Sequence, residues 1–123
     1  MLLDYYYSIK EQRTEGETAW FLVALNKDCD IYNGHFPGMP VAPGVCNIQM
    51  IKECTERMTG KQLLLSNISQ CKLMTLITPQ QHSELLVNIQ LLEQTDTTIK
   101  IKATIGQNDQ EYLVLKGECK VLN

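Results

Sequence analysis

The sequence has no run of 18 consecutive apolar residues, no excess of basic residues and no Cys-x-x-Cys pair. A membrane-spanning helix needs about 20 apolar residues, so we expect no membrane span. The net charge of -3 argues against a nucleic-acid-binding protein, because such proteins carry a basic surface. The first residues also lack the basic leader and the long apolar core of a signal peptide. We therefore expect a cytoplasmic protein.

Residues that ligate metals are few. The chain has two histidines and an odd number of dispersed cysteines, namely Cys29, Cys46, Cys54, Cys71 and Cys119. A structural zinc site needs closely spaced ligands, and a disulfide framework needs an even number of cysteines. We expect no metal site, and we expect most of the cysteines to be buried, reduced thiols.

The chain is long enough for one compact domain. A protein of 123 residues with 44% hydrophobic content can build a real core, and one of this size buries roughly 65% of the surface of its unfolded chain. Neither a repeat nor a low-complexity linker divides it. We expect a single domain over residues 1–123.

Strand-like and irregular segments precede a helical one. Residues 17–27 are rich in β-branched and aromatic side chains, which indicates a strand buried on both faces. Residues 28–42 show no regular pattern, and loops of that length in compact domains are usually functional or disordered. Tyr5, Tyr6 and Tyr7 have no mechanistic interpretation, and we expect them to pack at an edge.

A helix is expected between Pro43 and Gly60, because proline is favoured in a first helical turn and glycine just after a last one. Apolar residues recur between them at intervals of three and four, namely Val45, Ile48, Ile51, Cys54 and Met58, with Cys46 and Met50 beside them. So wide an apolar stripe is typical of a helix that a sheet wraps.

After Gly60 the apolar residues alternate with a period of two, which is the pattern of β-strands. Four such segments follow, at residues 63–74, 85–91, 98–105 and 113–121. One strand, a long loop, one long helix and four further strands favour an antiparallel sheet curled around the helix. His82 lies in a polar turn between two of these strands, so we expect it to be exposed to solvent.

The irregular segment contains the most informative stretch of the chain, Gly34-His35-Phe36-Pro37-Gly38-Met39-Pro40-Val41-Ala42-Pro43-Gly44-Val45. Each proline fixes φ and restricts the residue before it, so the loop is expected to be ordered. His35 can exchange a proton near neutral pH. The first amides of the following helix have no partners within the helix and can hold a negative charge, and Gly44 lets a ligand approach them.

This stretch resembles the His-Phe-Pro-Gly-x-Pro-x-x-Pro-Gly signature of the 3-hydroxyacyl-[acyl-carrier-protein] dehydratases. The resemblance implies an α+β hot-dog fold, an antiparallel sheet wrapped around one long central helix. It implies the removal of water from (3R)-hydroxyacyl thioesters of acyl carrier protein or CoA to give trans-2-enoyl thioesters. The pathway would be fatty-acid synthesis or a related polyene or polyketide route. A homodimer or higher oligomer without a cofactor is also implied.

By resemblance, His35 is the catalytic base, and the substrate-binding residues are Phe36, Gly38, Gly44 and Val45. The family has a carboxylate as the proton donor at the position of Gln49, and commonly a glutamine at the position of Glu53. The two residue types are therefore exchanged in this chain. Gln49 can hydrogen-bond to the substrate hydroxyl but cannot protonate it.

Glu53 lies one helical turn from Gln49, so it could supply the proton from the same face of the helix. It could equally be a solvated surface residue. In the dimer that the resemblance implies, His35 of one subunit would work with Gln49 and Glu53 of the other.

Two alternatives to a dehydratase remain open. The first is an acyl thioesterase on the same fold, in which water attacks a carbonyl polarised by the Gly44 amide. The second is a non-catalytic acyl-binding protein or a heterodimer subunit whose partner supplies the missing carboxylate.

Overall fold

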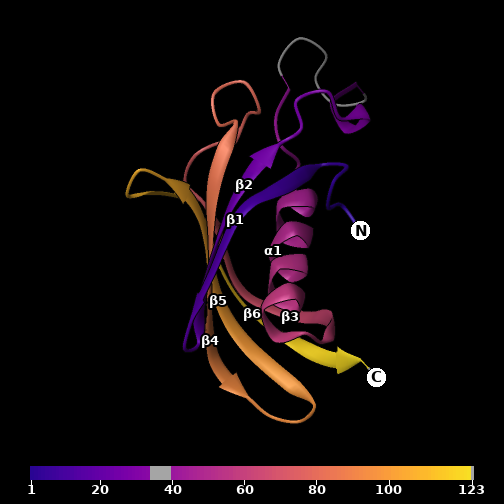
Figure 1. The fold of residues 1–123 in the computed structure, drawn as a ribbon, viewed down its shortest axis with the longest axis vertical. Helices are drawn as coiled ribbons and strands as arrows, with labels where there is room; N and C mark the ends of the chain where they lie inside the picture. The colour runs from indigo at the N-terminus through magenta and orange to yellow at the C-terminus, as the bar shows by residue number, and fades with distance from the viewer. Residues whose placement is uncertain (34–39, 123) are drawn as a thin grey trace.

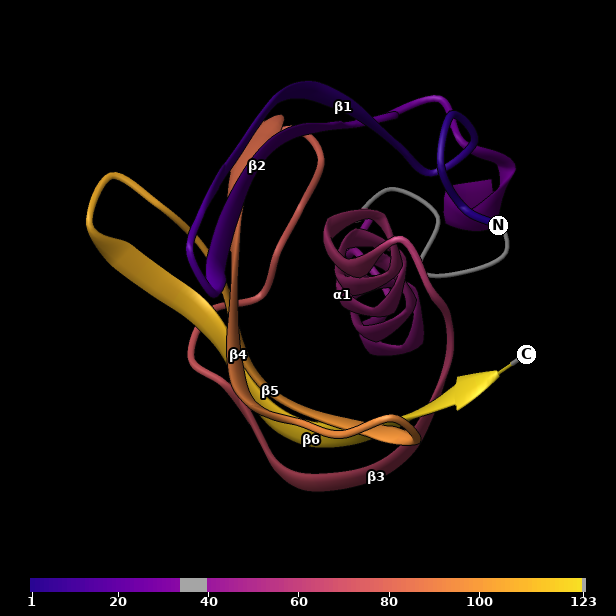
Figure 2. The same ribbon diagram turned by 60° about the horizontal axis from the view of Figure 1, so that its bottom comes forward.

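The computed structural model describes residues 1–33 and 40–122 of the chain. Its elements are β1 (Tyr7–Glu15), β2 (Thr18–Leu25), the 3-10 helix η1 (Asp30–Asn33), α1 (Gly44–Thr59), β3 (Gln62–Leu73), β4 (Glu84–Gln94), β5 (Thr98–Gln107) and β6 (Gln110–Leu122). The strands described form one antiparallel sheet in the order β1-β2-β4-β5-β6-β3 (Figure 1). Figure 2 shows this sheet curling around α1. The expected antiparallel sheet wrapped around one helix is therefore confirmed.

Strand β1 is an element that the sequence did not predict. It pairs with β2 through a tight hairpin in which Gly16 has a φ of 60°, a conformation that glycine adopts without strain. Most side chains of β1 are exposed, because the strand lies at an edge of the sheet. Its polar composition therefore gives no apolar alternation for a sequence pattern to detect.

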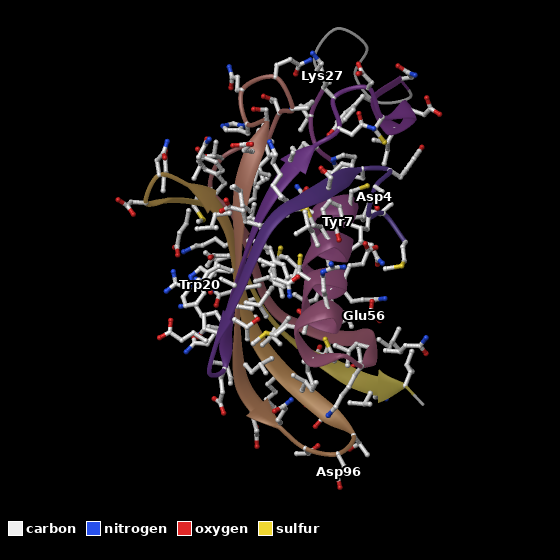
Figure 3. All side chains as sticks on the ribbon, in the orientation of Figure 1. Asp4, Tyr7, Trp20, Lys27, Glu56 and Asp96 are labelled. Atoms are coloured by element: carbon white, nitrogen blue, oxygen red, sulfur yellow. The ribbon has the colours of Figure 1, made fainter. Side chains whose placement is uncertain are left out.

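The concave face of the sheet carries the core. A row of directly paired residues crosses four strands and is almost fully buried, comprising Phe21, Val87, Ile105 and Leu113. Strand β2 alternates between buried and half-buried residues, so the prediction that it is buried on both faces was wrong. Trp20 lies on its outer face, away from α1 (Figure 3), where the guanidinium carbon of Arg13 is 5.5 Å from the centroid of the indole ring.

Helix α1 begins and ends as the sequence predicts. Pro43 is its extended N-terminal cap, and its carbonyl oxygen accepts hydrogen bonds from the amides of Cys46 and Asn47, each at 3.1 Å. Gly60 caps the other end in the left-handed conformation, with a φ of 71°, and its amide donates to the carbonyl oxygen of Glu56. Glycine is favoured there because it has no Cβ to clash.

The buried face of α1 differs from the predicted stripe. Val45 is 76% exposed, whereas Asn47 and Glu53 are buried beside the apolar residues Met50, Ile51 and Cys54. Both polar side chains are buried because groups near the N-terminus of the chain form hydrogen bonds with them. A pattern that counts only apolar residues places such a face incorrectly.

The edge of the sheet formed by β3 is exposed in the described part of the structure. Most residues of edge strand β3 are exposed, including the large apolar residues Leu64, Ile68 and Leu73. An exposed apolar edge strand is a surface on which another chain can pair. Among residues 1–33 and 40–122, no helix is both long and apolar enough to cross a membrane.

Candidate functional site

The start of α1 is one part of the candidate site. The backbone amides of Gly44 and Val45 have no acceptor among the described residues, since the first helical hydrogen bonds begin at Cys46 and Asn47. A Cβ added to Gly44 would meet no atom within 4 Å. Two amides at the positive end of a helix that find neither an acceptor nor a close neighbour among the described residues can hold an oxyanion. His35, Phe36 and Gly38, the other residues expected at this site, lie outside the described residues.

Glu53 is the centre of a buried hydrogen-bond network. Its Oε2 accepts from the amide of Leu2 at 2.8 Å and from Nε2 of Gln49 at 2.9 Å. Its Oε1 accepts from the amide of Leu3 at 3.1 Å and from the Tyr7 hydroxyl at 3.0 Å. Figure 3 shows Tyr7 lying beside α1. Glu53 is only 3% exposed, so of the two alternatives considered for it, the solvated surface residue was wrong.

This network keeps the Glu53 carboxyl ionised. Burial by itself raises its pKa, but the hydrogen-bond donors lower it. The amide of Leu2 lowers it most, followed by Gln49, Tyr7 and the amide of Leu3. Together they hold the pKa of Glu53 below its ordinary value. Burial also raises the pKa of Tyr7, so its hydroxyl keeps the proton that it donates. The arrangement therefore favours Glu53 as a hydrogen-bond acceptor. It does not favour the role of proton donor that the sequence left open for this residue.

The contact with Glu53 fixes the orientation of the Gln49 side chain. An ionised carboxylate can only accept hydrogen bonds, so the NH₂ group of Gln49 must be the group that faces it. The remaining polar atom of Gln49, its Oε1, has no hydrogen-bond donor among the described residues. Residue 49 therefore presents an acceptor on the half-exposed side of the helix.

A second buried polar cluster lies beside the first turn of α1. The Tyr6 hydroxyl donates to Oδ1 of Asn47 at 2.6 Å, and the rings of Tyr6 and Tyr32 have centroids 6.3 Å apart. Tyr32 comes just before the Pro-Gly loop, and its buried hydroxyl has no partner within residues 1–33 and 40–122. This cluster therefore links the residue before β1, η1 and the first turn of α1.

No role in the site was expected from the sequence for Tyr6, Tyr7 or Leu2. Each of them contacts a helix residue 41 to 51 positions away in the chain. No periodic pattern reports a contact over such a distance. The polar residues Asn47 and Glu53 within an apolar helix were the available signal, because buried polar groups need partners.

A groove of about 530 Å³ runs beside Glu53, along the C-terminal half of α1. Its walls include Leu3, Tyr7 and Ile9 on one side and Lys52 and Arg57 on the other. Neither Gly44, Val45 nor Gln49 lines it. The groove therefore shares Glu53 with the expected site but does not include the start of the helix, which is the better candidate on chemical grounds.

The two cysteines of α1 and that of β6 are not activated nucleophiles. All five cysteines of the chain are free, and Cys71 is the exposed one. Burial raises the pKa of the Cys46 thiol, that of Cys54 to about 12 and that of Cys119 to about 11. The expectation that most cysteines are buried, reduced thiols is confirmed. In the described part of the chain, no three His, Cys, Asp or Glu side chains gather as a metal site.

His82 is buried, so the prediction that it is exposed was wrong. Its ring lies against Tyr112 with centroids 4.7 Å apart, and it is 9% exposed. Its Nδ1 accepts a hydrogen bond from the amide of Thr78 at 3.1 Å, which closes the turn before β4. A histidine that satisfies a backbone amide and packs on an aromatic ring has a structural role there.

Comparison with known proteins identifies the family. Residues 11–114 match the model of the ApeI-like family, described as ApeI dehydratase. A 3-hydroxyacyl-[acyl-carrier-protein] dehydratase, FabZ, of Levilactobacillus brevis is 26% identical over 111 residues, which cover 80% of this chain and 74% of that protein.

Solved structures share the fold. The dehydratase heterocomplex ApeI:P from Xenorhabdus doucetiae matches with a TM-score of 0.69 and 20% identity, covering 94% of this chain and 96% of the other. A mutant of a thioesterase enzyme from Staphylococcus aureus matches with a TM-score of 0.67 and 12% identity, covering 99% of this chain and 98% of the other. Both the resemblance and the α+β hot-dog fold expected from the sequence are thereby confirmed. The chain belongs to the ApeI-like family of hot-dog dehydratases.

Proposed function

We propose that this protein takes part in the dehydration of (3R)-hydroxyacyl thioesters carried by acyl carrier protein or CoA. His35 removes the proton from C2, the bond between C3 and the hydroxyl oxygen breaks, and a double bond forms between C2 and C3. The amides of Gly44 and Val45, which have no acceptor within residues 1–33 and 40–122, are the observation that carries the proposal, because they can hold the charge that develops on the thioester oxygen. One preorganised donor of this kind lowers a barrier by about 3 kcal/mol.

The departing hydroxyl needs a proton that neither helix residue is suited to give. Gln49 has no ionisable proton, and the donors around Glu53 favour its ionised form. We propose that water or a carboxylic acid of a partner subunit supplies this proton. The relative from Xenorhabdus doucetiae is a dehydratase heterocomplex, which makes a second, different subunit a reasonable source.

An acyl thioesterase is the second candidate. The Oε1 of Gln49, which has no donor among the described residues, can accept a hydrogen bond from a water molecule and orient it towards a carbonyl that the Gly44 amide polarises. The thioesterase from Staphylococcus aureus shows that the same fold occurs among thioesterases. A non-catalytic acyl-binding subunit is the third candidate, because the acid at position 49 is missing.

Incubation of the pure protein with a 3-hydroxybutyryl thioester separates these candidates. We expect the ultraviolet absorbance of an enoyl thioester to appear, and His35→Ala to slow its formation by about 10²–10⁴, the range for a lost general base. The rate should rise with pH through an apparent pKa near that of imidazole. Release of free thiol would indicate the thioesterase. If neither product forms, even with a carboxylate-bearing family member added, the dehydratase proposal is wrong.

Assembly gives a separate prediction. Edge strand β3 exposes Leu64, Ile68 and Leu73, and one side of α1 exposes Val45. We expect β3 to pair with β3 of a second chain, because this joins two sheets into one and covers their edges. Light scattering at micromolar concentration should report about twice the 14.0 kDa of one chain. A mass of one chain under these conditions would refute the expectation.

A further inference from the structure

Glu53 joins two parts of the chain that are distant in sequence. The carboxylate receives two backbone amides and one hydroxyl from residues 2–7, and it receives the side-chain amide of Gln49 from α1. The Leu2 amide and the Gln49 amide share the same carboxylate oxygen, at 2.8 and 2.9 Å. The position of the N-terminal segment and the orientation of Gln49 are therefore coupled through one side chain.

A glutamine without such a neighbour can present either its oxygen or its NH₂ group, because the two ends have the same shape. The Glu53 carboxylate removes this freedom, since the opposite orientation would place the Gln49 oxygen against a negatively charged oxygen 2.9 Å away. Only the orientation with Oε1 free remains favourable. Any group bound beside residue 49 therefore meets a hydrogen-bond acceptor.

We propose that Glu53 is a positioning residue that makes Gln49 an acceptor and thereby selects acyl groups with a hydroxyl at C3 over those with a ketone. This rests on the proposed function, and it names how the same site recognises its substrate class. A C3 hydroxyl can donate to the free oxygen of Gln49. A C3 ketone has only lone pairs to offer and meets that oxygen unfavourably.

Binding of two unreactive analogues tests the selection. The probes are the 3-hydroxybutyryl and 3-oxobutyryl amides of pantetheine, in which nitrogen replaces the thioester sulfur so that neither is hydrolysed. We expect wild type to bind the hydroxy analogue about tenfold more tightly, as one net hydrogen bond implies. Glu53→Gln should reduce this ratio to about one, because an amide at 53 tolerates both orientations of Gln49.

The control is Glu56→Gln. Glu56 lies on the same helix, where it accepts a hydrogen bond from the Leu63 amide at 2.9 Å and forms an ion pair with Lys52. It forms no hydrogen bond with Gln49 among the described residues. This variant should keep the tenfold ratio. If Glu53 has a purely structural role, Glu53→Gln should weaken the binding of both analogues equally and leave the ratio of their affinities unchanged. That result would overturn the proposal.

Nuclear magnetic resonance tests the orientation of Gln49 directly, without any bound substrate. The side-chain NH₂ signals of Gln49 should show one proton shifted downfield and exchanging slowly in wild type and in Glu56→Gln, but not in Glu53→Gln. Signals that are the same in all three proteins would overturn the positioning role. If wild type has these signals but binds neither analogue, the proposed function fails while the orientation of Gln49 stands.

Discussion

Glu53→Ala is expected to lower the free energy of unfolding by about 3 kcal/mol. The substitution leaves the amides of Leu2 and Leu3, the Tyr7 hydroxyl and the Gln49 amide without their acceptor. Each buried donor left unpaired costs about 1–3 kcal/mol, and the sum is reduced because the residues near the N-terminus can move into water. Denaturation by urea measures the change.

The same network predicts how stability depends on pH. Because the folded pKa of Glu53 is lowered from its ordinary value of 4.5, the carboxylate contributes fully above about that pH. Its contribution is lost as the pH falls through the lowered folded value. Glu53→Gln should remove this part of the acid sensitivity, while Glu118→Gln, on the half-exposed outer face of β6, should not. Equal acid sensitivity in wild type and Glu53→Gln would contradict the assignment of an ionised Glu53.

Gln49→Glu is expected to increase enoyl thioester formation by about 10²–10⁴, the usual contribution of a general acid. The new carboxyl would lie against the Glu53 carboxylate, in the place of the amide that now donates at 2.9 Å. Two negative charges so close are unfavourable, so the pair would retain one proton near neutral pH. In the proposed reaction, that proton would be available to the departing hydroxyl from position 49 itself.

Two variants make this gain interpretable. Gln49→Glu with Glu53→Gln creates the arrangement that the sequence motif leads one to expect in the dehydratases, and it should also be more active than wild type. Gln49→Leu, which removes both hydrogen-bonding groups, should give no gain. An unchanged rate in both carboxylate-bearing proteins would show that the acid comes from water or from another subunit, and that position 49 does not limit the reaction.

The sequence predicted the elements that have strong local signals. Pro43 and Gly60 bound the helix where their backbone preferences place them, and the alternating segments after Gly60 became β3 to β6. The hot-dog fold followed from their order and from the motif. Strand β1 was not predicted, because its exposed, polar side chains show no periodic pattern of apolar residues.

The site could be predicted only in part. Positions 44, 45 and 49 followed from the motif and stay predictions; the amides of Gly44 and Val45 have no acceptor in the described part of the chain. The role of Glu53 did not follow, because its partners Leu2 and Tyr7 are 51 and 46 residues away and no local rule connects them. The burial of His82 was also not predicted, because it depends on a contact with a residue far away in the chain. The ring of Tyr112 in β6 covers it.

The place of Trp20 decides what an optical experiment on this protein can report. It is the single tryptophan of the chain, and it lies under Arg13 on the outer face of the sheet, with α1 on the other side. Its fluorescence should therefore respond when the hairpin of β1 and β2 opens, and it should stay constant when a ligand occupies the start of the helix. A fluorescent reporter of ligand binding would have to be introduced, for example by replacing the exposed Val45 with tryptophan.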